Sequence, residues 1–595
     1  MEMTELWHGA RIDHARAEAG PALLQVRGLD VWYPGGPAVQ GFDLDVRSDE
    51  VVALVGESGC GKSTAAAAIA GLLPDKARVG GEILFDGYDL LAAPESTLRD
   101  LRGNQIGMIF QEPMTSLNPV LTIGEQITEV LRRHRKLTAA AARARAIELL
   151  DLVRIPEPQR RIDDHPHNLS GGQRQRVMIA IAVACEPRLL IADEPTTALD
   201  VTIQAQVLEL LSTLRREMSM ALLLITHDLA VVGQWADRVA VMQRGRKVEE
   251  GTRDQVFFAP RHRYSQGLLE ASLHVEPEIH YTRVKLAEIR QGVDETTGEH
   301  SFSFTHQERR TLPAVREAVI HPAPVLDVRN LVAQYSSRYG TISAVKDVSF
   351  QIGRGETLGL VGESGCGKST LSKTIVGLNP AVQGQVILDG TDIAPLRGRA
   401  LRAHRANVQL VFQDPYASLN PRLSVESTLD EMLVVQGGHH RNERRRRVLA
   451  MLDAVGLPSS ALKRYPHEFS GGQRQRIGIA RALILRPKLL ICDEPVSALD
   501  VSVRAQILNL FVDLKQEFGL SYLFISHDLS VINYIADRVM VMQKGVVVET
   551  LERDALFTSA SHPYTQTLIA ATPGWPEPGI VQTDVPSEPL LVRTA

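Results

Sequence analysis

Two nine-residue stretches of the chain carry residue types that bind phosphate. The sequence Gly-Glu-Ser-Gly-Cys-Gly-Lys-Ser-Thr occurs at residues 56–64 and again at residues 362–370. Both copies fit the pattern G-x-x-x-x-G-K-[ST], in which glycines let backbone N–H groups turn toward phosphate oxygens. In this pattern the lysine reaches the β- and γ-phosphates of a nucleotide, and the serine after it ligates Mg²⁺. The expected phosphate-binding residues are Gly56, Ser58, Gly59, Cys60, Gly61, Lys62, Ser63 and Thr64, and Gly362, Ser364, Gly365, Cys366, Gly367, Lys368, Ser369 and Thr370.

The segments on either side of both stretches supply the structure that a phosphate-binding loop needs. An apolar run precedes each stretch, at residues 51–55 and 357–361, and is typical of a buried strand. A helix-favouring run follows, such as residues 65–73, and a helix start adds the positive end of its dipole to the site. One copy alone could be a Gly/Ser-rich turn. Two identical copies, each between a strand and a helix, favour nucleotide binding.

Paired carboxylates end an apolar run in each half of the chain, as Asp193-Glu194 and Asp493-Glu494. In open α/β sheets, ligands bind at the carboxyl ends of the strands. We expect Asp193 and Asp493 to hold Mg²⁺, and Glu194 and Glu494 to polarise the attacking water. Such a pair on its own would be an exposed acidic turn, but its place beside a phosphate loop favours catalysis.

Two further polar residues recur at matching places in both halves. His227 and His527 follow short apolar runs, and this recurrence favours contact with the γ-phosphate over a purely structural role. Gln111 and Gln413 also follow apolar runs, where a neutral amide can contact both Mg²⁺ and the attacking water.

Aromatic side chains and a glycine-rich motif complete the set. Tyr33 and Tyr335 lie upstream of the two phosphate loops, where an aromatic face can stack on adenine, although Tyr339 competes with Tyr335 for this role. A Ser-Gly-Gly-Gln motif precedes a helical run in each half, and exposed amides at a helix start form an anion site. The residues of this motif are Ser170, Gly171, Gly172 and Gln173, and Ser470, Gly471, Gly472 and Gln473.

These motifs recur in the same order at nearly constant spacing, which indicates duplication of a whole domain. The predicted boundaries are an N-terminal extension at 1–20, domains at 21–272 and 324–575, a linker at 273–323 and a tail at 576–595. The linker is rich in charge and poor in apolar periodicity, so we expect a partly irregular connector over the surface. The proline-rich tail is expected to be loosely ordered.

Each domain is predicted to have an α/β fold. Apolar strands alternate with helices, which favours a mostly parallel core sheet. Alternating strands near residues 84–87 and 388–390 predict a small antiparallel sheet beside it, and residues 125–153 and 427–455 predict a helical lobe.

The bulk composition limits the classes of partner. The net charge of -5 gives no sign of a nucleic-acid-binding surface. The cysteines are Cys60, Cys185, Cys366 and Cys492, whose spacing fits neither a metal site nor a disulfide framework. Residues 1–20 are charged throughout and unlike a secretory signal, and no apolar run approaches the ~20 residues of a membrane-spanning helix. Any membrane role is therefore expected to go through other polypeptides.

Taken together, the motifs resemble those of the ATP-binding cassette (ABC) family over nearly the whole chain. The set comprises the phosphate loop, the glutamine, the Ser-Gly-Gly-Gln signature, the Asp-Glu strand end, the switch histidine and an Ala-Leu-Asp turn. That turn occurs at residues 198–200 and 498–500. Phe469 stands where the family usually has leucine before the signature, and because it is apolar we expect little effect. The resemblance implies two tandem P-loop NTPase domains that bind ATP and Mg²⁺.

A narrower resemblance is to the ATPases of bacterial peptide and nickel importers, with both copies fused. It rests on Ser-Leu-Asn-Pro after each glutamine, at 116–119 and 418–421, and on His-Pro-Tyr-Thr-Gln at 562–566, with a weaker echo at 262–266 where Arg263 departs. It implies two transmembrane permease subunits, an extracytoplasmic substrate-binding protein and a peripheral position on the cytoplasmic face of the membrane. An iron–sulfur cluster, which some relatives hold after the cassette, is not expected because no cysteine lies between Cys185 and Cys366 or after Cys492.

The family's head-to-tail arrangement further implies that each phosphate loop works with the signature of the other half. A rival interpretation is a soluble tandem cassette ATPase that acts on ribosomes or nucleic acid; the acidic balance and the His-Pro-Tyr-Thr segment count against it. The transported solute stays open at this point: dipeptides, oligopeptides, glutathione-like molecules, nickel and haem all fit the resemblance.

Overall fold

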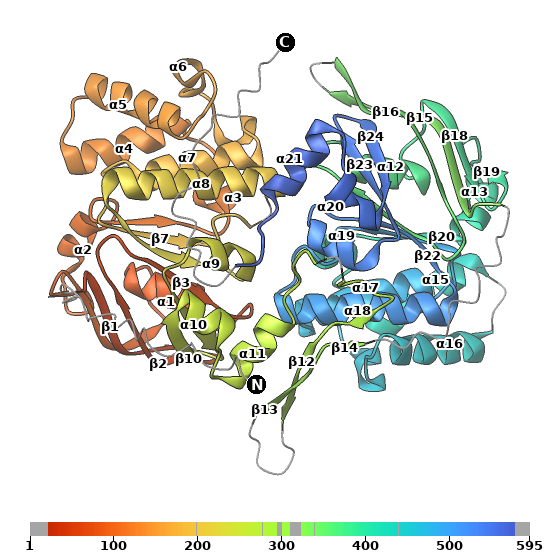
Figure 1. The fold of residues 1–595 in the computed structure, drawn as a ribbon, viewed down its shortest axis with the longest axis horizontal. Helices are drawn as coiled ribbons and strands as arrows, with labels where there is room; N and C mark the ends of the chain where they lie inside the picture. Colours follow the sequence, from red (N-terminus) through yellow and green to blue (C-terminus); the bar gives the residue numbers. More distant parts are fainter. Residues whose placement is uncertain are drawn as a thin grey trace, which may run out of the picture.

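The chain folds into two similar halves that lie side by side in Figure 1. This computed structural model describes residues 22–576, apart from 198, 277, 294–299, 310–322, 338–339 and 438–439. The N-terminal extension at 1–20 and the tail beyond residue 576 lie outside the described residues, and the domain boundaries stay predictions.

A mostly parallel six-stranded sheet forms the centre of the first half. Its strands are β3 (Val51–Val55), β6 (Ile106–Ile109), β7 (Leu189–Asp193), β8 (Ala221–Ile225), β9 (Arg238–Gln243) and β10 (Arg246–Thr252). Their order is β10-β9-β3-β8-β7-β6, and only β10 runs antiparallel to its neighbour. The second half repeats this sheet with β17 (Thr357–Val361), β20 (Val408–Val411), β21 (Leu489–Asp493), β22 (Ser521–Ile525), β23 (Arg538–Gln543) and β24 (Val546–Glu552). The predicted parallel core is therefore confirmed.

A four-stranded antiparallel sheet accompanies each core sheet, as the alternating strands predict. The first consists of β1 (Leu24–Tyr33), β2 (Gly36–Val46), β4 (Arg78–Phe85) and β5 (Tyr88–Asp89). The second consists of β15 (Leu326–Ser337), β16 (Gly340–Ile352), β18 (Gln383–Leu388) and β19 (Thr391–Asp392).

Helices cover the sheets and form a lobe in each half. In the first half they are α1 (Lys62–Ile69), α2 (Glu95–Leu101), α3 (Pro113–Ser116), α4 (Ile123–Arg135), α5 (Ala139–Leu152), α6 (Pro158–Arg161), α7 (Gly171–Val183), α8 (Val201–Met218), α9 (Leu229–Trp235), α10 (Arg253–Phe258) and α11 (Arg263–Glu270). In the second half they are α12 (Lys368–Ile375), α13 (Gly398–Arg405), α14 (Pro415–Ser418), α15 (Val425–Gln436), α16 (Arg441–Ala454), α17 (Gly471–Leu483), α18 (Val501–Phe518), α19 (Leu529–Ile535), α20 (Leu556–Ser559) and α21 (Pro563–Ala571). In the described residues, no helix is both long enough and apolar enough to cross a membrane.

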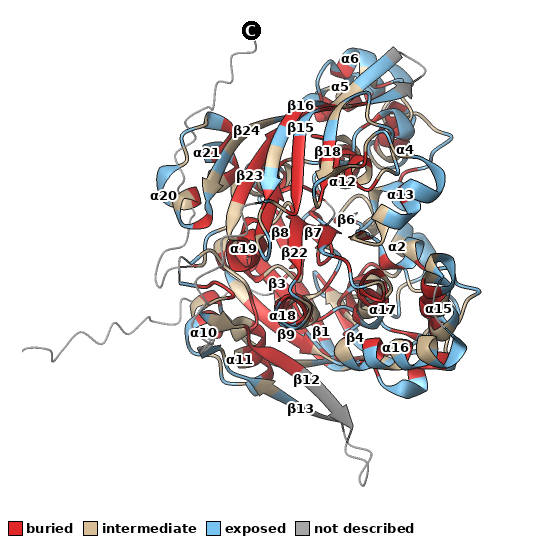
Figure 2. Cartoon of the chain, turned by 90° about the vertical axis from the view of Figure 1, so that its right-hand side faces the viewer, coloured by how far each residue is buried: buried red, intermediate tan, exposed pale blue. Residues whose placement is uncertain are grey.

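The core strands are the most deeply buried part of the molecule. Every residue of β3, β7, β8, β17, β21 and β22 is buried, and these strands form the red centre of Figure 2. Parallel strands need apolar residues on both faces because helices cover both sides of the sheet. This burial holds the ends of β7 and β21 in place, and the candidate residues Glu194 and Glu494 come directly after those ends.

The connector differs from its prediction. Its strands are β11 (Val284–Lys285), β12 (Glu288–Val293), β13 (His300–Thr305) and β14 (Glu308–Arg309), and Figure 1 places β12 and β13 under α18 of the second half. Ile279, Tyr281, Leu286 and Ile289 are buried and belong to a hydrophobic core whose other members come from both halves, most of them from the second. The expectation of a connector over the surface is therefore wrong for these residues, because their apolar side chains cover a face of another domain.

Candidate nucleotide-hydrolysis sites

The first phosphate loop has the backbone shape that only glycine allows. Gly61 has a φ of 103°, and a Cβ there would lie 2.5 Å from the carbonyl oxygen of Ala38. The buried Lys62 Nζ donates hydrogen bonds to the carbonyl oxygens of Gly56 and Glu57, both at 2.8 Å. The lysine is thus folded over its own loop, where its charge lies beside the space that the loop encloses.

The second loop repeats this geometry. A Cβ on Gly367 would lie 2.2 Å from the carbonyl oxygen of Ala344. Lys368 Nζ donates to the carbonyl oxygens of Gly362, at 2.6 Å, and Glu363, at 2.9 Å. Both halves therefore carry a complete loop of the same shape.

The loop serine and the strand-end aspartate meet in both halves. Ser63 Oγ donates to Asp193 Oδ1 and Ser369 Oγ donates to Asp493 Oδ1, each at 3.1 Å. Burial raises the pKa of Asp193 to about 6, and the charge of Glu194 adds to the rise while the Ser63 hydrogen bond opposes it. A serine hydroxyl beside a buried aspartate carboxylate forms part of the all-oxygen donor set that Mg²⁺ prefers, so these residues fit the metal that the resemblance implies.

A hydrogen-bonded group gathers around Glu194. Gln111 Nε2 donates to Glu194 Oε2 at 2.9 Å, and His227 Nδ1 lies 3.3 Å from Glu194 Oε1. Burial alone raises the pKa of Glu194, but bonds from His227 and Thr197 outweigh it and lower the pKa to about 2. Glu194 has a φ of 47°, a strained left-handed conformation for a residue with a side chain. The structure thus brings together the predicted base, glutamine and histidine.

The second half assembles the same group with one difference. Gln413 Nε2 donates to Glu494 Oε2 at 2.8 Å, and His527 Nδ1 lies 3.2 Å from Glu494 Oε2. The hydroxyl of Ser497, however, donates to the backbone carbonyl of Glu494, whereas Thr197 donates to the carboxylate of Glu194. The Glu494 carboxylate therefore lacks the hydroxyl hydrogen bond that Thr197 donates to the Glu194 carboxylate.

The signature serines cap the helices that follow them. Ser170 Oγ accepts from the Gln173 backbone N–H at 3.3 Å, and Ser470 Oγ accepts from that of Gln473 at 3.4 Å. A Cβ on Gly172 would lie 2.8 Å from Ile203. This glycine lets α7 pack closely on α8. In the described residues, no hydrogen bond joins Ser170 or Ser470 to a phosphate loop.

The two tyrosines differ in their surroundings. Tyr335 is half exposed, and its hydroxyl lies 2.7 Å from Thr370 Oγ1, at the end of the second phosphate loop. Tyr33 ends β1 and packs against the apolar core below. Tyr339, the alternative to Tyr335 for stacking on adenine, lies outside the described residues.

Contacts between the halves join each phosphate loop to the Ala-Leu-Asp turn of the other half. The Ser58 N–H donates to Asp500 Oδ2 at 3.3 Å, and the Ser364 N–H donates to Asp200 Oδ2 at 3.2 Å. Ser502 Oγ donates to Glu57, and Thr202 Oγ1 donates to Glu363 Oε1 at 3.0 Å. Each loop is therefore hydrogen-bonded to the other half.

Two tyrosines of the His-x-Tyr segments also reach the loops. The Glu57 N–H donates to Tyr264 Oη at 3.3 Å, and the Glu363 N–H donates to Tyr564 Oη at 2.9 Å. His262 and His562 cap α11 and α21 in the same way, so the Arg263 departure leaves the local geometry intact. In the sequence these segments indicate only the family resemblance, and their contact with the site was not predicted. The recurrence of these segments after each cassette was the sequence signal that could have indicated this contact.

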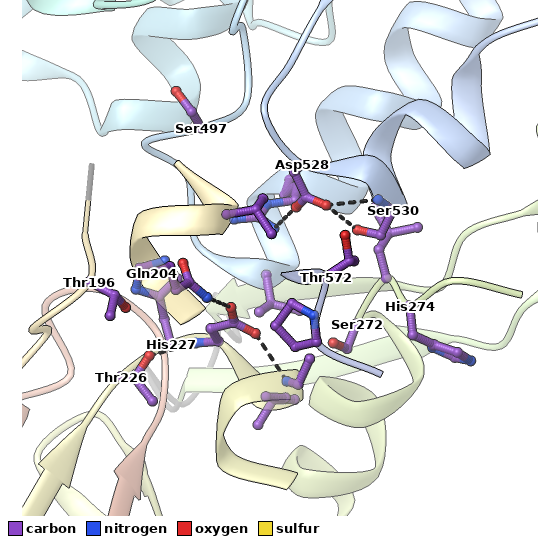
Figure 3. A pocket seen from close by; sticks show the side chains of 18 of the residues that line it. Thr196, Gln204, Thr226, His227, Ser272, His274, Ser497, Asp528, Ser530 and Thr572 are labelled. Carbon is purple, nitrogen blue, oxygen red and sulfur yellow. Dashed lines mark hydrogen bonds and ion pairs between the residues drawn. The ribbon is translucent and has the colours of Figure 1, made fainter. Parts of the chain in front are cut away.

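Both histidines face one cavity between the halves. Figure 3 shows Thr226 and His227 of the first half across from Asp528 and Ser530 of the second. His527 also lines this cavity. The two candidate sites thus border a common space.

Comparison with known proteins agrees with this geometry. The family model described as ABC transporter matches residues 39–197 and 345–497. The chain belongs to the ABC transporter family. A second family model, described as the C-terminal region of oligopeptide/dipeptide transporters, matches residues 248–300 and 548–589.

Similar ABC proteins cover most of this chain. The chain is 47% identical over 569 residues to the glutathione import ATP-binding protein GsiA of Pectobacterium atrosepticum, covering 93% of this chain and 89% of the relative. It is 46% identical to GsiA of Escherichia coli K12, covering 90% of this chain and 86% of the relative. A dimeric ATP-binding cassette with ADP and Pi, MJ0796, is 29% identical with a TM-score of 0.36, covering 38% of this chain and 98% of that one. The protein is therefore an ATP-hydrolysing subunit of an ABC importer of the peptide type, and it acts with membrane permease partners.

Proposed function

We propose that this ABC protein powers the import of glutathione or a similarly short peptide, using two ATP sites shared between its halves. The support for the solute is the 46–47% identity to proteins named for glutathione import. The observation that carries the shared sites is the contact of each phosphate loop with Asp200 or Asp500 of the opposite half.

The residues of each site would have separate roles in ATP hydrolysis. Lys62 and Lys368 would neutralise charge on the β- and γ-phosphates, with the loop N–H groups. Ser63 and Asp193, and Ser369 and Asp493, would hold Mg²⁺, with Gln111 and Gln413 beside them. The metal would supply positive charge at the phosphates. Glu194 and Glu494 would orient the attacking water and accept its proton, while His227 and His527 hold these carboxylates in place.

The opposite half would complete each site. The N–H groups at the start of α17 would face the nucleotide held by Lys62, and those at the start of α7 would face the nucleotide held by Lys368. Tyr33 and Tyr335 would stack on the two adenine rings. Closing the halves on two nucleotides would bring these parts together, and hydrolysis would let them separate.

The importer would include further polypeptides. We propose two transmembrane permease subunits, a substrate-binding protein outside the membrane and a peripheral position for this chain on the cytoplasmic face. The C-terminal-region matches in both halves favour this importer over a ribosome- or nucleic-acid-associated ATPase. We propose no iron–sulfur cluster and no nucleic-acid partner, since the described cysteines are buried singly and the net charge is -5.

Transport by reconstituted protein tests the solute. The chain would be assembled in vesicles with the permease subunits and binding protein encoded beside it. ATP would be supplied on the side of this chain, and labelled glutathione on the other. We expect ATP-dependent uptake, and none with Lys62→Ala, Lys368→Ala double-mutant protein. Uptake of nickel or haem but no short peptide would contradict the proposed solute, and co-purification with ribosomes would contradict the importer.

A further inference from the structure

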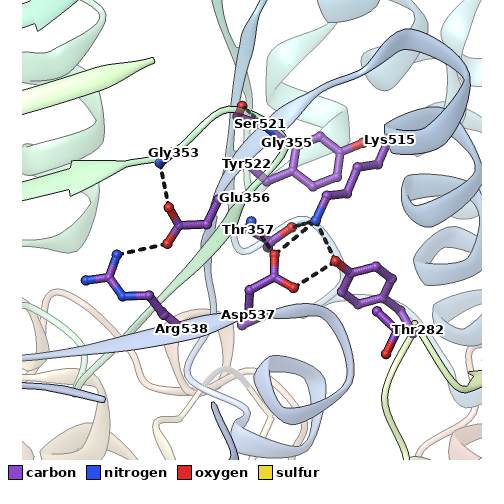
Figure 4. Close-up of polar contacts among 12 residues, drawn as sticks. Thr282, Gly353, Gly355, Glu356, Thr357, Lys515, Ser521, Tyr522, Asp537 and Arg538 are labelled. Carbon is purple, nitrogen blue, oxygen red and sulfur yellow. Dashed lines mark hydrogen bonds and ion pairs between the residues drawn. The ribbon is translucent and has the colours of Figure 1, made fainter. Parts of the chain in front are cut away.

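A docking site on the second half is filled by the connector. Tyr281 Oη donates to Asp537 Oδ1 at 2.8 Å, and the buried Lys515 Nζ donates to Tyr281 Oη at 2.8 Å and to Asp537 Oδ2 at 3.1 Å. Figure 4 shows Lys515, Asp537 and Thr357 around this point. The tyrosine completes a buried polar cluster that would otherwise lack one hydrogen-bond donor.

Backbone contacts extend this docking along α18 and α19. Asn509 exchanges hydrogen bonds with the Leu286 backbone at 3.1 and 3.0 Å. Asn533 Nδ2 donates to the carbonyl oxygen of Glu276 at 2.9 Å, and the Tyr281 N–H donates to that of Tyr534 at 2.9 Å. The segment that follows the first cassette thus binds the second cassette through specific contacts.

The first half carries the counterpart of this site as a groove. Its lining residues are Val51, Leu208, Leu211, Ser212, Arg215, Arg216, Leu222, Leu224, Gln234, Trp235 and Asp237. By the repeat between the halves, Arg215, Leu222 and Asp237 occupy the places of Lys515, Tyr522 and Asp537. Asp237 Oδ2 accepts from the Val51 N–H at 2.8 Å, as Asp537 Oδ2 accepts from the Thr357 N–H. No described residue donates to Asp237 Oδ1, the counterpart of the atom that Tyr281 contacts.

The described chain ends beside this groove. Trp575 stacks on His274 at the start of the connector, with ring centroids 4.5 Å apart, and packs edge-on against Phe257 of the first half, with centroids 5.5 Å apart. Pro576 packs on α9, because its ring lies 2.7 Å from the position of a Cβ on Gly233. Residues 570–576 line a pocket together with Leu208, Gln234 and Trp235, and these three residues also line the groove.

The sequence after Pro576 resembles the connector. Glu577-Pro578-Gly579-Ile580 repeats the pattern of residues 276–279, where Ile279 is buried against the second half. Two residues after each isoleucine come Tyr281 in the connector and Gln582 in the tail, and a glutamine amide can also donate to a carboxylate. Residues 577–595 would span up to about 60 Å when extended, far more than the groove requires.

We propose that residues 577–595 dock in the groove of the first half. The groove supplies apolar side chains, Leu208 and Trp235, that suit an isoleucine such as Ile580, and a carboxylate acceptor, Asp237 Oδ1, that suits the Gln582 amide. The connector of the first half holds the second half, and the tail of the second half holds the first. The two cassettes are thereby held together by two segments, each of which binds the opposite half.

Disulfide cross-linking in the full chain tests the place of the tail. Gln582→Cys would be paired with Ser212→Cys in the groove, and separately with the exposed Thr97→Cys on α2 as a matched control. The native cysteines are buried, which keeps the background low. We expect an intramolecular 582–212 link after mild oxidation, at least tenfold more than the 582–97 link. Equal yields, or a link to another copy or to a permease subunit, would overturn the proposal.

Hydrogen exchange supplies a second readout that needs no cysteine. We expect Ile580→Asp and a chain that ends at Pro576 both to raise exchange in residues 229–237 severalfold. The corresponding segment 529–537, which the connector covers, should stay unchanged. Exchange in 229–237 that matches the wild-type chain in both variants would contradict docking of the tail, even if the proteins fold normally.

Discussion

Glu194 and Glu494 combine strained backbone with a dense set of hydrogen bonds, which fits residues that must hold one orientation. We predict that Glu194→Gln and Glu494→Gln each reduce ATP turnover by ~10²–10⁴-fold, because a positioned general base is lost. ATP binding should stay intact, since among the described residues neither carboxylate is hydrogen-bonded to its phosphate loop. Turnover in the assembled transporter and nucleotide binding would be measured for each variant. Wild-type turnover in either one would refute two coupled sites.

Tyr564 and Tyr264 connect the segments after the cassettes to the phosphate loops. We predict that Tyr564→Phe weakens ATP binding at the Lys368 site by ~2–10-fold, because the Glu363 N–H loses its acceptor. Tyr264→Phe should act on the Lys62 site in the same way. Titration with a fluorescent ATP analogue would measure the effect, with the exposed Tyr88→Phe as a control. An effect of equal size in Tyr88→Phe would argue against this role.

The residues of each site differ in how far the sequence predicts them. Lys62, Asp193 and Glu194 carry fixed spacing, so their types and order indicate their chemistry. The contacts of Tyr264 with Glu57, and of Asp200 with Ser364, depend on how segments far apart in the chain pack. No local pattern encodes that packing.

The connector carries a buried histidine that makes its docking sensitive to pH. Burial, with the charges of Arg553 and Lys515, lowers the pKa of His280 to about 4, although Asp537 opposes this. The unfolded chain binds this proton near pH 6.5, so the free energy of unfolding should fall as the pH drops from 6.5 to 4. We predict a loss on the order of 3 kcal/mol from this group.

Urea unfolding at pH 7 and pH 4.5 measures that loss. The His280→Gln variant cannot take up the proton, so its stability should fall less than that of the wild-type chain over the same range. An equal fall in both proteins would show that His280 is not the cause.

The core strands and the helical lobes follow from apolar runs and periodicity, and the structure confirms them. The packing of the connector cannot be predicted in this way, because Ile279, Tyr281 and Leu286 are separated by polar residues and show no regular period. Their burial depends on Asn509, Lys515 and Tyr534, which lie more than two hundred residues later in the chain. Such a long-range match is visible only in the folded molecule.

At the scale of the whole molecule, the two halves expose unlike residues at matching positions. In the segment after the glutamine, Val120 of the first half has 76% of its surface accessible. The corresponding residue of the second half is the exposed Arg422. We predict that Val120→Cys and Arg422→Cys cross-link to different permease subunits, since an apolar and a charged position suit different partners. Mass spectrometry of the linked products would identify each partner. Equal linking of both positions to the same subunit would count against one chain serving two distinct permeases.

Each ATP site is proposed to be shared between the halves. Asp200 and Asp500 already contact the opposite loops, and closure would bring each signature to the nucleotide across from it. A bulky charge at the signature serine would then block the opposite site. We predict that Ser470→Arg impairs hydrolysis at the Lys62 site while nucleotide stays bound at the Lys368 site.

Photo-labelling with an ATP analogue, mapped by peptide, measures which loop is affected. If the sites are shared, Ser470→Arg should alter the labelling of residues 56–64 and leave the labelling of residues 362–370 unchanged. Ser170→Arg should give the reverse pattern. Loss confined to residues 362–370 in Ser470→Arg would show that each cassette is self-contained and would contradict the shared sites.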